Sequence, residues 1–202
     1  DPTVSVGGMM DAIGGNIRVG SADLFVTEAC EYTNSFLSFY PTMGIILNIE
    51  ADHLDFFKDI EDIRRSFRRF AKLLPEDGVL IINSDIRDYR EITEGIAARV
   101  VTVGSDPEAS DYSAANIRFN EEACAAYELL VHGQPVQTIT LGTPGMHNVY
   151  NSFAAAAAAH ELGLTGAYID TGHLRFPWTS RRLAPTVRIV GVYVVDRVPL
   201  PP

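Results

Sequence analysis

The 202-residue sequence has few cysteines and no long apolar run. Its two cysteines, Cys30 and Cys124, are far apart, so they form neither a disulfide framework nor the close spacing of a zinc knuckle. Free thiols are typical of a reducing compartment, and we expect a cytoplasmic protein. No apolar stretch approaches the ~20 residues of a membrane-spanning helix, and the first residues do not resemble a signal peptide. We therefore expect no membrane partner.

Positive charge is also scarce. The chain has 16 Lys and Arg against 26 Asp and Glu, which gives a formal net charge of -10. Nonspecific nucleic-acid binding needs a basic surface, so this composition argues against a nucleic-acid partner. A nucleotide substrate stays possible because Mg²⁺ can mediate contact with phosphate. The dinucleotide-binding motif G-x-G-x-x-G does not follow an expected strand in these residues. The phosphate-loop motif G-x-x-x-x-G-K-[ST] does not occur in them.

An alternation of apolar strands and amphipathic helices predicts the fold class. We expect strands at residues 24–27, 44–49, 79–82 and 100–103, a short helix or turn at 32–39, and helices at 59–74 and 89–98. Strands that alternate with helices usually form a parallel sheet. The sequence therefore predicts an α/β fold with a mostly parallel, doubly wound sheet flanked by helices.

The rest of the chain has other patterns. Three shorter alternating runs predict a small antiparallel β subsheet at about residues 111–142, and the runs are residues 112–119, 125–131 and 136–141. The glycine-rich residues 1–20 predict loops around short extended pieces. An alanine-rich helix is expected over residues 147–162. A short helix near 167–174 and an apolar strand at 187–195 complete the expected elements.

Acidic side chains follow two of the expected strands. Glu28 lies at the end of the first of these strands, residues 24–27, and Glu31 lies one turn further along the chain. The second strand, residues 44–49, leads into the run Asn48-Ile49-Glu50-Ala51-Asp52-His53-Leu54-Asp55. Ligands bind at the carboxyl ends of strands in open α/β sheets, so adjacent strands would bring Glu28 within reach of His53. Hard oxygen ligands with one imidazole suit Mg²⁺ or Mn²⁺ better than zinc. The alternative is surface carboxylates and a histidine that caps a loop.

Two further motifs could contact a nucleotide. In Gly145-Met146-His147-Asn148-Val149-Tyr150-Asn151 a glycine loop opens a helix, and Asn148 and Asn151 share a face. A helix N-terminus favours anions and an amide can hydrogen-bond a purine edge, although simple N-capping is the alternative. The pair Arg181-Arg182 is either a phosphate clamp or a solvated basic turn.

Together these motifs resemble the central domain of the Mur ligases. The resemblance rests on Glu28-Ala29-Cys30-Glu31-Tyr32 with Ser35-Phe36, on residues 48–55, and on Gly145-Met146-His147-Asn148 with Asn151. It implies one ATP-binding domain over residues 1–196, with the antiparallel subsheet inside it, followed by an unmatched tail at 197–202. Among the members of this family, the motifs are most similar to those of the enzyme that adds L-alanine to UDP-N-acetylmuramate.

The resemblance implies an ATP-dependent ligase of peptidoglycan precursor synthesis with ATP and Mg²⁺ as cofactors. ATP phosphorylates the muramate carboxylate of UDP-N-acetylmuramate, and the amine of L-alanine attacks the acyl phosphate. Glu28 is then implied as a Mg²⁺ ligand and His53 as a ligand of a second Mg²⁺. The implied nucleotide contacts are Asn148 at adenine, His147 and Asn151 in support of that loop, Arg182 (or Arg181) near the phosphates and Asp196 near the ribose.

The chain also departs from the family pattern. The phosphate loop G-T-x-G-K-T, expected just before residue 1, does not occur in it, and Leu183-Ala184-Pro185 replaces the expected aromatic and acid. Residues 197–202 replace a second Asp and a Tyr-Ala-His-His-Pro run, as a reading-frame disruption or a truncated gene product would explain. We therefore expect residues 1–202 alone to be inactive. The alternatives are a murein tripeptide-recycling ligase, a non-catalytic nucleotide-binding remnant and an unrelated nucleotide-binding module.

Overall fold

The computed structural model describes residues 1–164 and 192–196. The chain forms two compact units. Of the described residues, the first unit comprises Asp1–Leu80, Ile86–Val100 and 192–196, and the second comprises Ile81–Asp85 and 101–164. Within the described residues, no helix combines the length and the apolarity needed to cross a bilayer.

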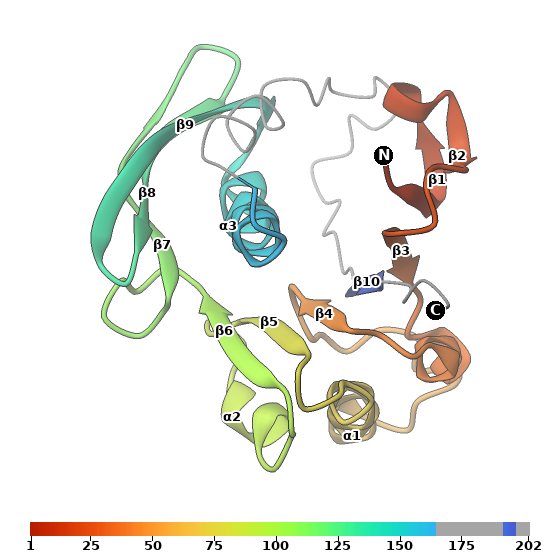
Figure 1. Cartoon of the computed structure of the whole chain (residues 1–202). Helices are drawn as coiled ribbons and strands as arrows, with labels where there is room; N and C mark the ends of the chain where they lie inside the picture. Colours follow the sequence, from red (N-terminus) through yellow and green to blue (C-terminus); the bar gives the residue numbers. More distant parts are fainter. Residues whose placement is uncertain (165–191, 197–202) are drawn as a thin grey trace. The chain divides into compact units, whose positions relative to one another are not determined.

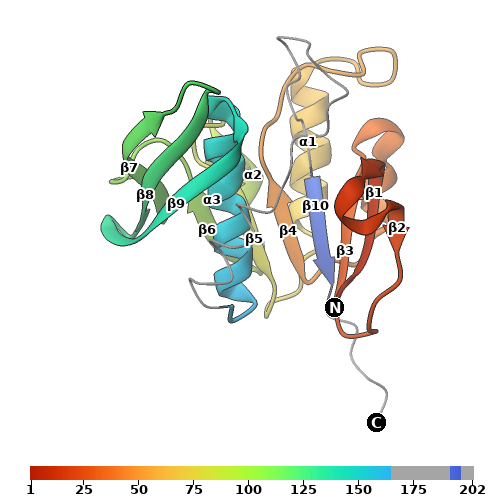
Figure 2. The ribbon, with the colours of Figure 1, turned by 90° about the horizontal axis from the view of Figure 1, so that it is seen from above.

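Five strands pair in the first unit. They are β1 (Thr3–Met10), β2 (Gly15–Arg18), β3 (Phe25–Ala29), β4 (Met43–Ile46) and β10 (Val192–Asp196). β1 pairs antiparallel with β2 and parallel with β3, while β10 lies between β3 and β4 and runs antiparallel to both (Figure 2). β10 therefore interrupts the parallel part of the sheet with one strand of opposite direction.

The structure corrects the expectation for residues 1–20. We expected loops around short extended pieces, but β1 is an eight-residue strand that forms a hairpin with β2. The alternating Thr3-Val4-Ser5-Val6 supplies the β-branched side chains that favour a strand. Gly14, at φ +68°, supplies the left-handed residue of the connection between the strands.

The helix α1 (Ile60–Ala71) confirms the amphipathic pattern. Asp59 caps its N-terminus by accepting a hydrogen bond from the Asp62 amide at 2.8 Å. Its buried face includes Phe67 and Phe70, which meet the fully buried Phe36 from the 3₁₀ segment η2 (Tyr32–Ser38). The Phe36 and Phe70 rings stack at 5.0 Å. Burial of one such ring contributes about 1.5–3 kcal/mol and anchors η2 on α1.

The face of α1 that carries arginines is not fully solvated. The Arg64 side chain is only 11% exposed and donates to the carbonyls of Arg87 and Asp88 at 2.7 and 2.8 Å. It also pairs with Glu91 of α2 (Tyr89–Thr93) at 3.0 Å. α2 is shorter than expected, because Glu94 is extended and Gly95 takes φ +71°.

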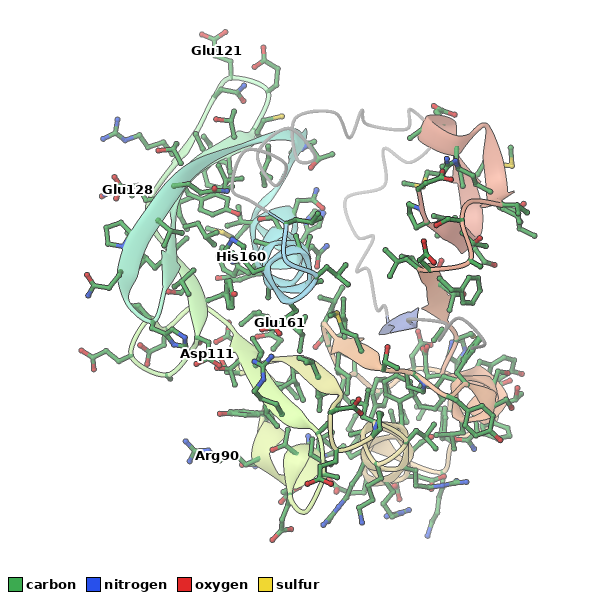
Figure 3. The ribbon with its side chains drawn as sticks, viewed as in Figure 1. Arg90, Asp111, Glu121, Glu128, His160 and Glu161 are labelled. Atoms are coloured by element: carbon green, nitrogen blue, oxygen red, sulfur yellow. The ribbon has the colours of Figure 1, made fainter. Side chains whose placement is uncertain are left out.

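The second unit contains the predicted antiparallel subsheet. Its strands β7 (Tyr112–Phe119), β8 (Cys124–Val131) and β9 (Gln134–Pro144) pair in sequence order, and the end of β6 (Arg99–Val103) pairs parallel with β7. Asp111, labelled in Figure 3, accepts bonds from the Thr102 amide and hydroxyl at 2.8 and 2.9 Å. The boundaries between the two units fall within β6 and within β5 (Val79–Asn83), so each of these strands has residues in both units.

The helix α3 (Met146–Glu161) packs on this subsheet (Figure 1). Its buried face is rich in alanine, which allows close approach to the strands. Tyr127 of β8 hydrogen-bonds Ser152 and meets the Phe153 ring edge-on at 5.5 Å, and burial raises the pKa of this tyrosine. At the other end of the helix lies His160, which is labelled in Figure 3. Its Nδ1 is 3.1 Å from the Tyr112 hydroxyl of β7. The subsheet thus holds the helix whose first turn carries the predicted nucleotide contacts.

Candidate functional site

Glu28 lies in β3 and is tied to the neighbouring strand β1. Its Oε2 accepts a hydrogen bond from the Gly7 amide at 2.7 Å. A Cβ atom at residue 7 would lie 3.1 Å from that same oxygen, so a glycine there gives the carboxylate room to reach the backbone. Thr27 and Ala29 are buried while Glu28 is exposed, as the two-residue period of a strand requires.

The carboxylate that the structure places against His53 is Glu31. Its Oε1 lies 3.6 Å from His53 Nε2, and Asp52 Oδ1 lies 4.0 Å from the other ring nitrogen. Glu31 is 9% exposed, whereas the His53 side chain is 35% exposed. A carboxylate this deeply buried needs a positive or hydrogen-bonding neighbour, and the imidazole faces it. We expected adjacent strands to bring Glu28 within reach of His53, but β10 lies between β3 and β4, and the Glu28 carboxylate accepts a hydrogen bond from Gly7.

The backbone at His53 is held in a tight turn. His53 takes φ +52°, a left-handed conformation that few non-glycine residues adopt. Its amide donates to Asp52 Oδ1 at 2.7 Å, and its carbonyl accepts from the amides of Phe56 and Phe57, both at 2.9 Å. The Phe57 side chain is 2% exposed and fixes this turn to the core of the first unit.

Tyr32 joins the two predicted acidic segments. Its ring centroid lies 4.6 Å from that of His53, and its hydroxyl donates to Asp55 Oδ2 at 2.7 Å. That hydrogen bond lowers the pKa of Asp55, and the same bond together with the Asp55 charge raises the pKa of Tyr32. The sequence motifs included Tyr32 and Asp55, but neither residue was assigned a role. Their positions, directly beside Glu31 and near His53, could have indicated one.

The donor set at His53 fits a cation of a particular kind. Across residues 1–164 and 192–196, no group of three or more His, Cys, Asp or Glu side chains could hold a metal ion. Mg²⁺ commonly takes one or two carboxylates and completes its shell with water and substrate phosphates. One buried carboxylate beside an imidazole therefore fits Mg²⁺ that arrives with a nucleotide and does not fit a closed structural metal centre.

The loop before α3 is shaped by a glycine. Gly145 takes φ +101° and ψ +147°, a region that is essentially reserved for glycine. A Cβ atom there would lie 2.7 Å from Cε1 of the His147 ring, so this ring lies against Gly145. The Asn148 amide group donates to the Pro144 carbonyl at 2.8 Å, and the Asn148 backbone amide donates to the Gly145 carbonyl at 3.1 Å. Asn151 follows one turn later and is half-buried.

The remaining predicted contacts are outside these two regions. Arg181 and Arg182 lie outside the described residues. Asp196 ends β10, where its backbone is paired opposite Phe25 of β3. The roles expected for these three residues stay predictions.

The sequence matches a known domain and several curated proteins. Residues 15–159 match the Mur ligase middle domain. A UDP-N-acetylmuramate–L-alanine ligase of Lachnospira eligens is 54% identical over 196 residues, which are 97% of this chain and 43% of the relative. The ligase of the same name from Agathobacter rectalis is 46% identical, over 97% of this chain and 42% of the relative. The chain thus spans less than half the length of these relatives.

The fold also matches solved structures. A UDP-N-acetylmuramate:L-alanyl-γ-D-glutamyl-meso-diaminopimelate ligase of Neisseria meningitides superposes with a TM-score of 0.76 at 21% identity, covering 89% of this chain and 59% of that one. The UDP-N-acetylmuramate–alanine ligase of Thermotoga maritima gives 0.71 at 24% identity, covering 87% and 38%. A MurF ligase of Thermotoga maritima, solved in complex with ADP, gives 0.51 at 21% identity, covering 62% and 28%. These likenesses confirm the expected α/β fold class.

Proposed function

We propose, from the premise that this chain belongs to the Mur ligase family through its middle domain, that its parent protein is an ATP-dependent ligase that joins L-alanine to UDP-N-acetylmuramate. The observation that carries this proposal is the 54% identity over 97% of the chain to a ligase named for that reaction. Residues 1–196 would form the ATP-binding domain, and residues 197–202 a tail outside it.

The charge of the chain supports a role for Mg²⁺. The net charge is -10, and both ATP and a UDP-linked sugar acid are anionic. An anionic nucleotide approaches carboxylates only if a cation offsets the repulsion. When bound, Mg²⁺ supplies charge neutralisation for the transferring phosphoryl group.

Three side chains of the first unit would serve Mg²⁺. We assign His53 as a Mg²⁺ ligand, and the Glu31 carboxylate, 3.6 Å from its Nε2, as the group that orients the ring. Glu28 keeps its predicted role as a Mg²⁺ ligand, and His53 would hold a second Mg²⁺. Its hydrogen bond to Gly7 holds the carboxylate in one orientation, which is what a ligand on a strand needs.

The residues of the Gly145 loop, which we define as residues 144–151, would contact the base. The hydrogen bond to the Pro144 carbonyl uses one hydrogen of the Asn148 amide and fixes the plane of that group. An amide with a fixed plane can recognise the edge of adenine. His147 and Asn151 would support this loop, the former through its ring against Gly145.

The test is a ligation assay on two samples. One is the protein expressed from the complete reading frame around these residues, and the other is residues 1–202 alone. With ATP, UDP-N-acetylmuramate and L-alanine, we expect ADP and phosphate release from the first sample and none from the second. Release that needs a murein tripeptide in place of L-alanine would identify the recycling ligase instead. Release from residues 1–202 alone would contradict the expected inactivity.

A further inference from the structure

The orientation of the His53 ring is set by contacts outside its own turn. The turn fixes the His53 backbone, because the Asp52 carboxylate and the Phe56 and Phe57 amides bond to it. These bonds do not restrict rotation of the imidazole about its side-chain torsions. A ring that is 35% exposed would otherwise be free to turn toward solvent.

We propose that Tyr32 is a positioning residue that holds the His53 imidazole in place for its metal ion. This inference rests on the proposed role of His53 as a Mg²⁺ ligand. The Tyr32 ring packs on the imidazole with a centroid distance of 4.6 Å and a tilt of 30°, while Glu31 Oε1 faces the edge of the same ring. Two consecutive residues thus restrain the imidazole, one at its face and one at its edge.

Tyr32 is itself restrained at both ends of its side chain. Its hydroxyl donates to Asp55, two residues beyond His53, so the ring spans the same turn that it packs against. The Phe56 ring meets it edge-on at 6.0 Å. Because Tyr32 is 36% exposed, these directed contacts, rather than deep burial, define where its ring lies.

The backbone that follows Tyr32 is strained, and the core holds it. Thr33 and Asn34 take φ +56° and +60°, which costs each of these non-glycine residues conformational energy. The Asn34 side chain accepts a hydrogen bond from the buried Ser66 of α1, and Phe36 packs on Phe70. The fold thus maintains an unfavourable local conformation immediately beside the residue that contacts His53.

The experiment compares single variants of residues 1–202 by NMR and by Mn²⁺ titration, with Mn²⁺ as the probe for the Mg²⁺ site. The variants are Tyr32→Ala, Tyr32→Phe, His53→Ala and the control Tyr40→Ala, which removes a tyrosine that is 87% exposed. Proton chemical shifts of the His53 ring report its stacking on Tyr32 without metal. Water-proton relaxation gives the Mn²⁺ dissociation constant.

We expect Tyr32→Ala to abolish the ring-current shift at His53 and to weaken Mn²⁺ binding roughly three- to tenfold, as the loss of one aromatic contact implies. Tyr32→Phe keeps the ring but loses the hydrogen bond to Asp55, so its ring-current shift and its affinity should lie between those of the wild type and Tyr32→Ala. Tyr40→Ala should change neither quantity. If Tyr32→Ala does not fold, Tyr32→Leu, which fills similar space without an aromatic ring, replaces it.

Two results separate the possible failures. Unchanged Mn²⁺ binding in Tyr32→Ala, with binding lost in His53→Ala, would overturn the role of Tyr32 and leave the metal site standing. Unchanged binding in His53→Ala would overturn the metal site itself, and the positioning role with it. Equal losses in Tyr32→Ala and Tyr40→Ala would show a general destabilisation and would also contradict the proposal.

Discussion

The His53 cluster, defined as Glu31, Tyr32, His53 and Asp55, and the Gly145 loop are built in opposite ways. In the cluster, side chains from two distant segments hold each other, and the Tyr32–Asp55 bond joins residues 23 positions apart. In the loop, the bond from Asn148 to Pro144 spans four positions. One region depends on tertiary structure for its geometry, and the other is shaped mainly by its own backbone.

This difference predicts how each region responds to damage. Substitutions far from the His53 cluster in sequence should disturb it, because the segments that carry it are anchored separately. The Gly145 loop should respond mainly to changes at its own glycine and within its first helical turn.

The largest effect is expected at Phe36, the anchor of the segment that carries Glu31 and Tyr32. Phe36→Ala removes a fully buried ring stacked on Phe70, and we expect the free energy of unfolding to fall by about 3–5 kcal/mol. Urea unfolding followed by circular dichroism measures this. Tyr40→Ala is the control and should stay within about 0.5 kcal/mol. A loss below about 1 kcal/mol for Phe36→Ala would show that the segment is anchored elsewhere.

The next effect is expected at Gly145. Gly145→Ala places a Cβ atom 2.7 Å from the His147 ring and forces alanine into a backbone region reserved for glycine. We expect a loss of about 2–3 kcal/mol in the same measurement. Gly95→Ala is the matched control, because Gly95 also has positive φ but meets nothing within 4 Å of a new Cβ. Equal losses at the two positions would contradict a contribution of the His147 ring to the destabilisation caused by Gly145→Ala.

A smaller effect is expected at Asn148. Asn148→Ala removes the hydrogen bond to the Pro144 carbonyl, which is worth about 1 kcal/mol. Because the loop is held locally, NMR shifts should change within residues 144–151 and leave those of the His53 cluster as they were. Shift changes that reach His53 would contradict the contrast between the two regions.

The smallest effect is expected at Asp62, in the first turn of α1, and concerns the pH dependence of stability. The Lys58 amide bonds the Asp62 carboxylate and, with Arg65, lowers its pKa. A folded pKa below the ordinary value of about 3.9 means that this stabilisation is present above that pH and is lost as the pH falls through the lowered value. The stability difference between the wild type and Asp62→Asn should therefore be present at pH 7 and vanish in strong acid. A difference that grows as the pH falls would reverse the sign and refute the assignment.

The sequence predicted the local features well. The helix α3 begins one residue before the expected start, because its alanine run has a high helix propensity. The helix α1 lies inside the expected range, because Asp59 caps its start and one of its faces is apolar. The expected helix over residues 89–98 was too long, because a short polar pattern does not show where Gly95 ends it. The hairpin of β1 and β2 was missed because glycines conceal the alternation of Thr3 to Val6.

The sequence could not predict which side chains from distant segments contact each other. Glu28 and Glu31 are both close to the end of β3, and either could have faced His53. The strand period turns Glu28 toward Gly7, while Glu31, beyond the end of the strand, is buried against the imidazole. The contact of Tyr32 with Asp55 depends on two turns with positive φ, at Thr33 and at His53. No local sequence pattern predicts these two backbone conformations.

Mn²⁺-induced broadening of NMR signals shows whether Glu31 and His53 serve a divalent cation. As Mn²⁺ is added to residues 1–202, we expect the signals of His53 and its neighbours to broaden first. Exposed acids of the second unit, such as Glu108 and Glu121, should broaden only at higher concentration. Broadening that begins at those exposed acids, or that is uniform over the acidic surface, would show that Glu31 and His53 do not form a preferred cation site.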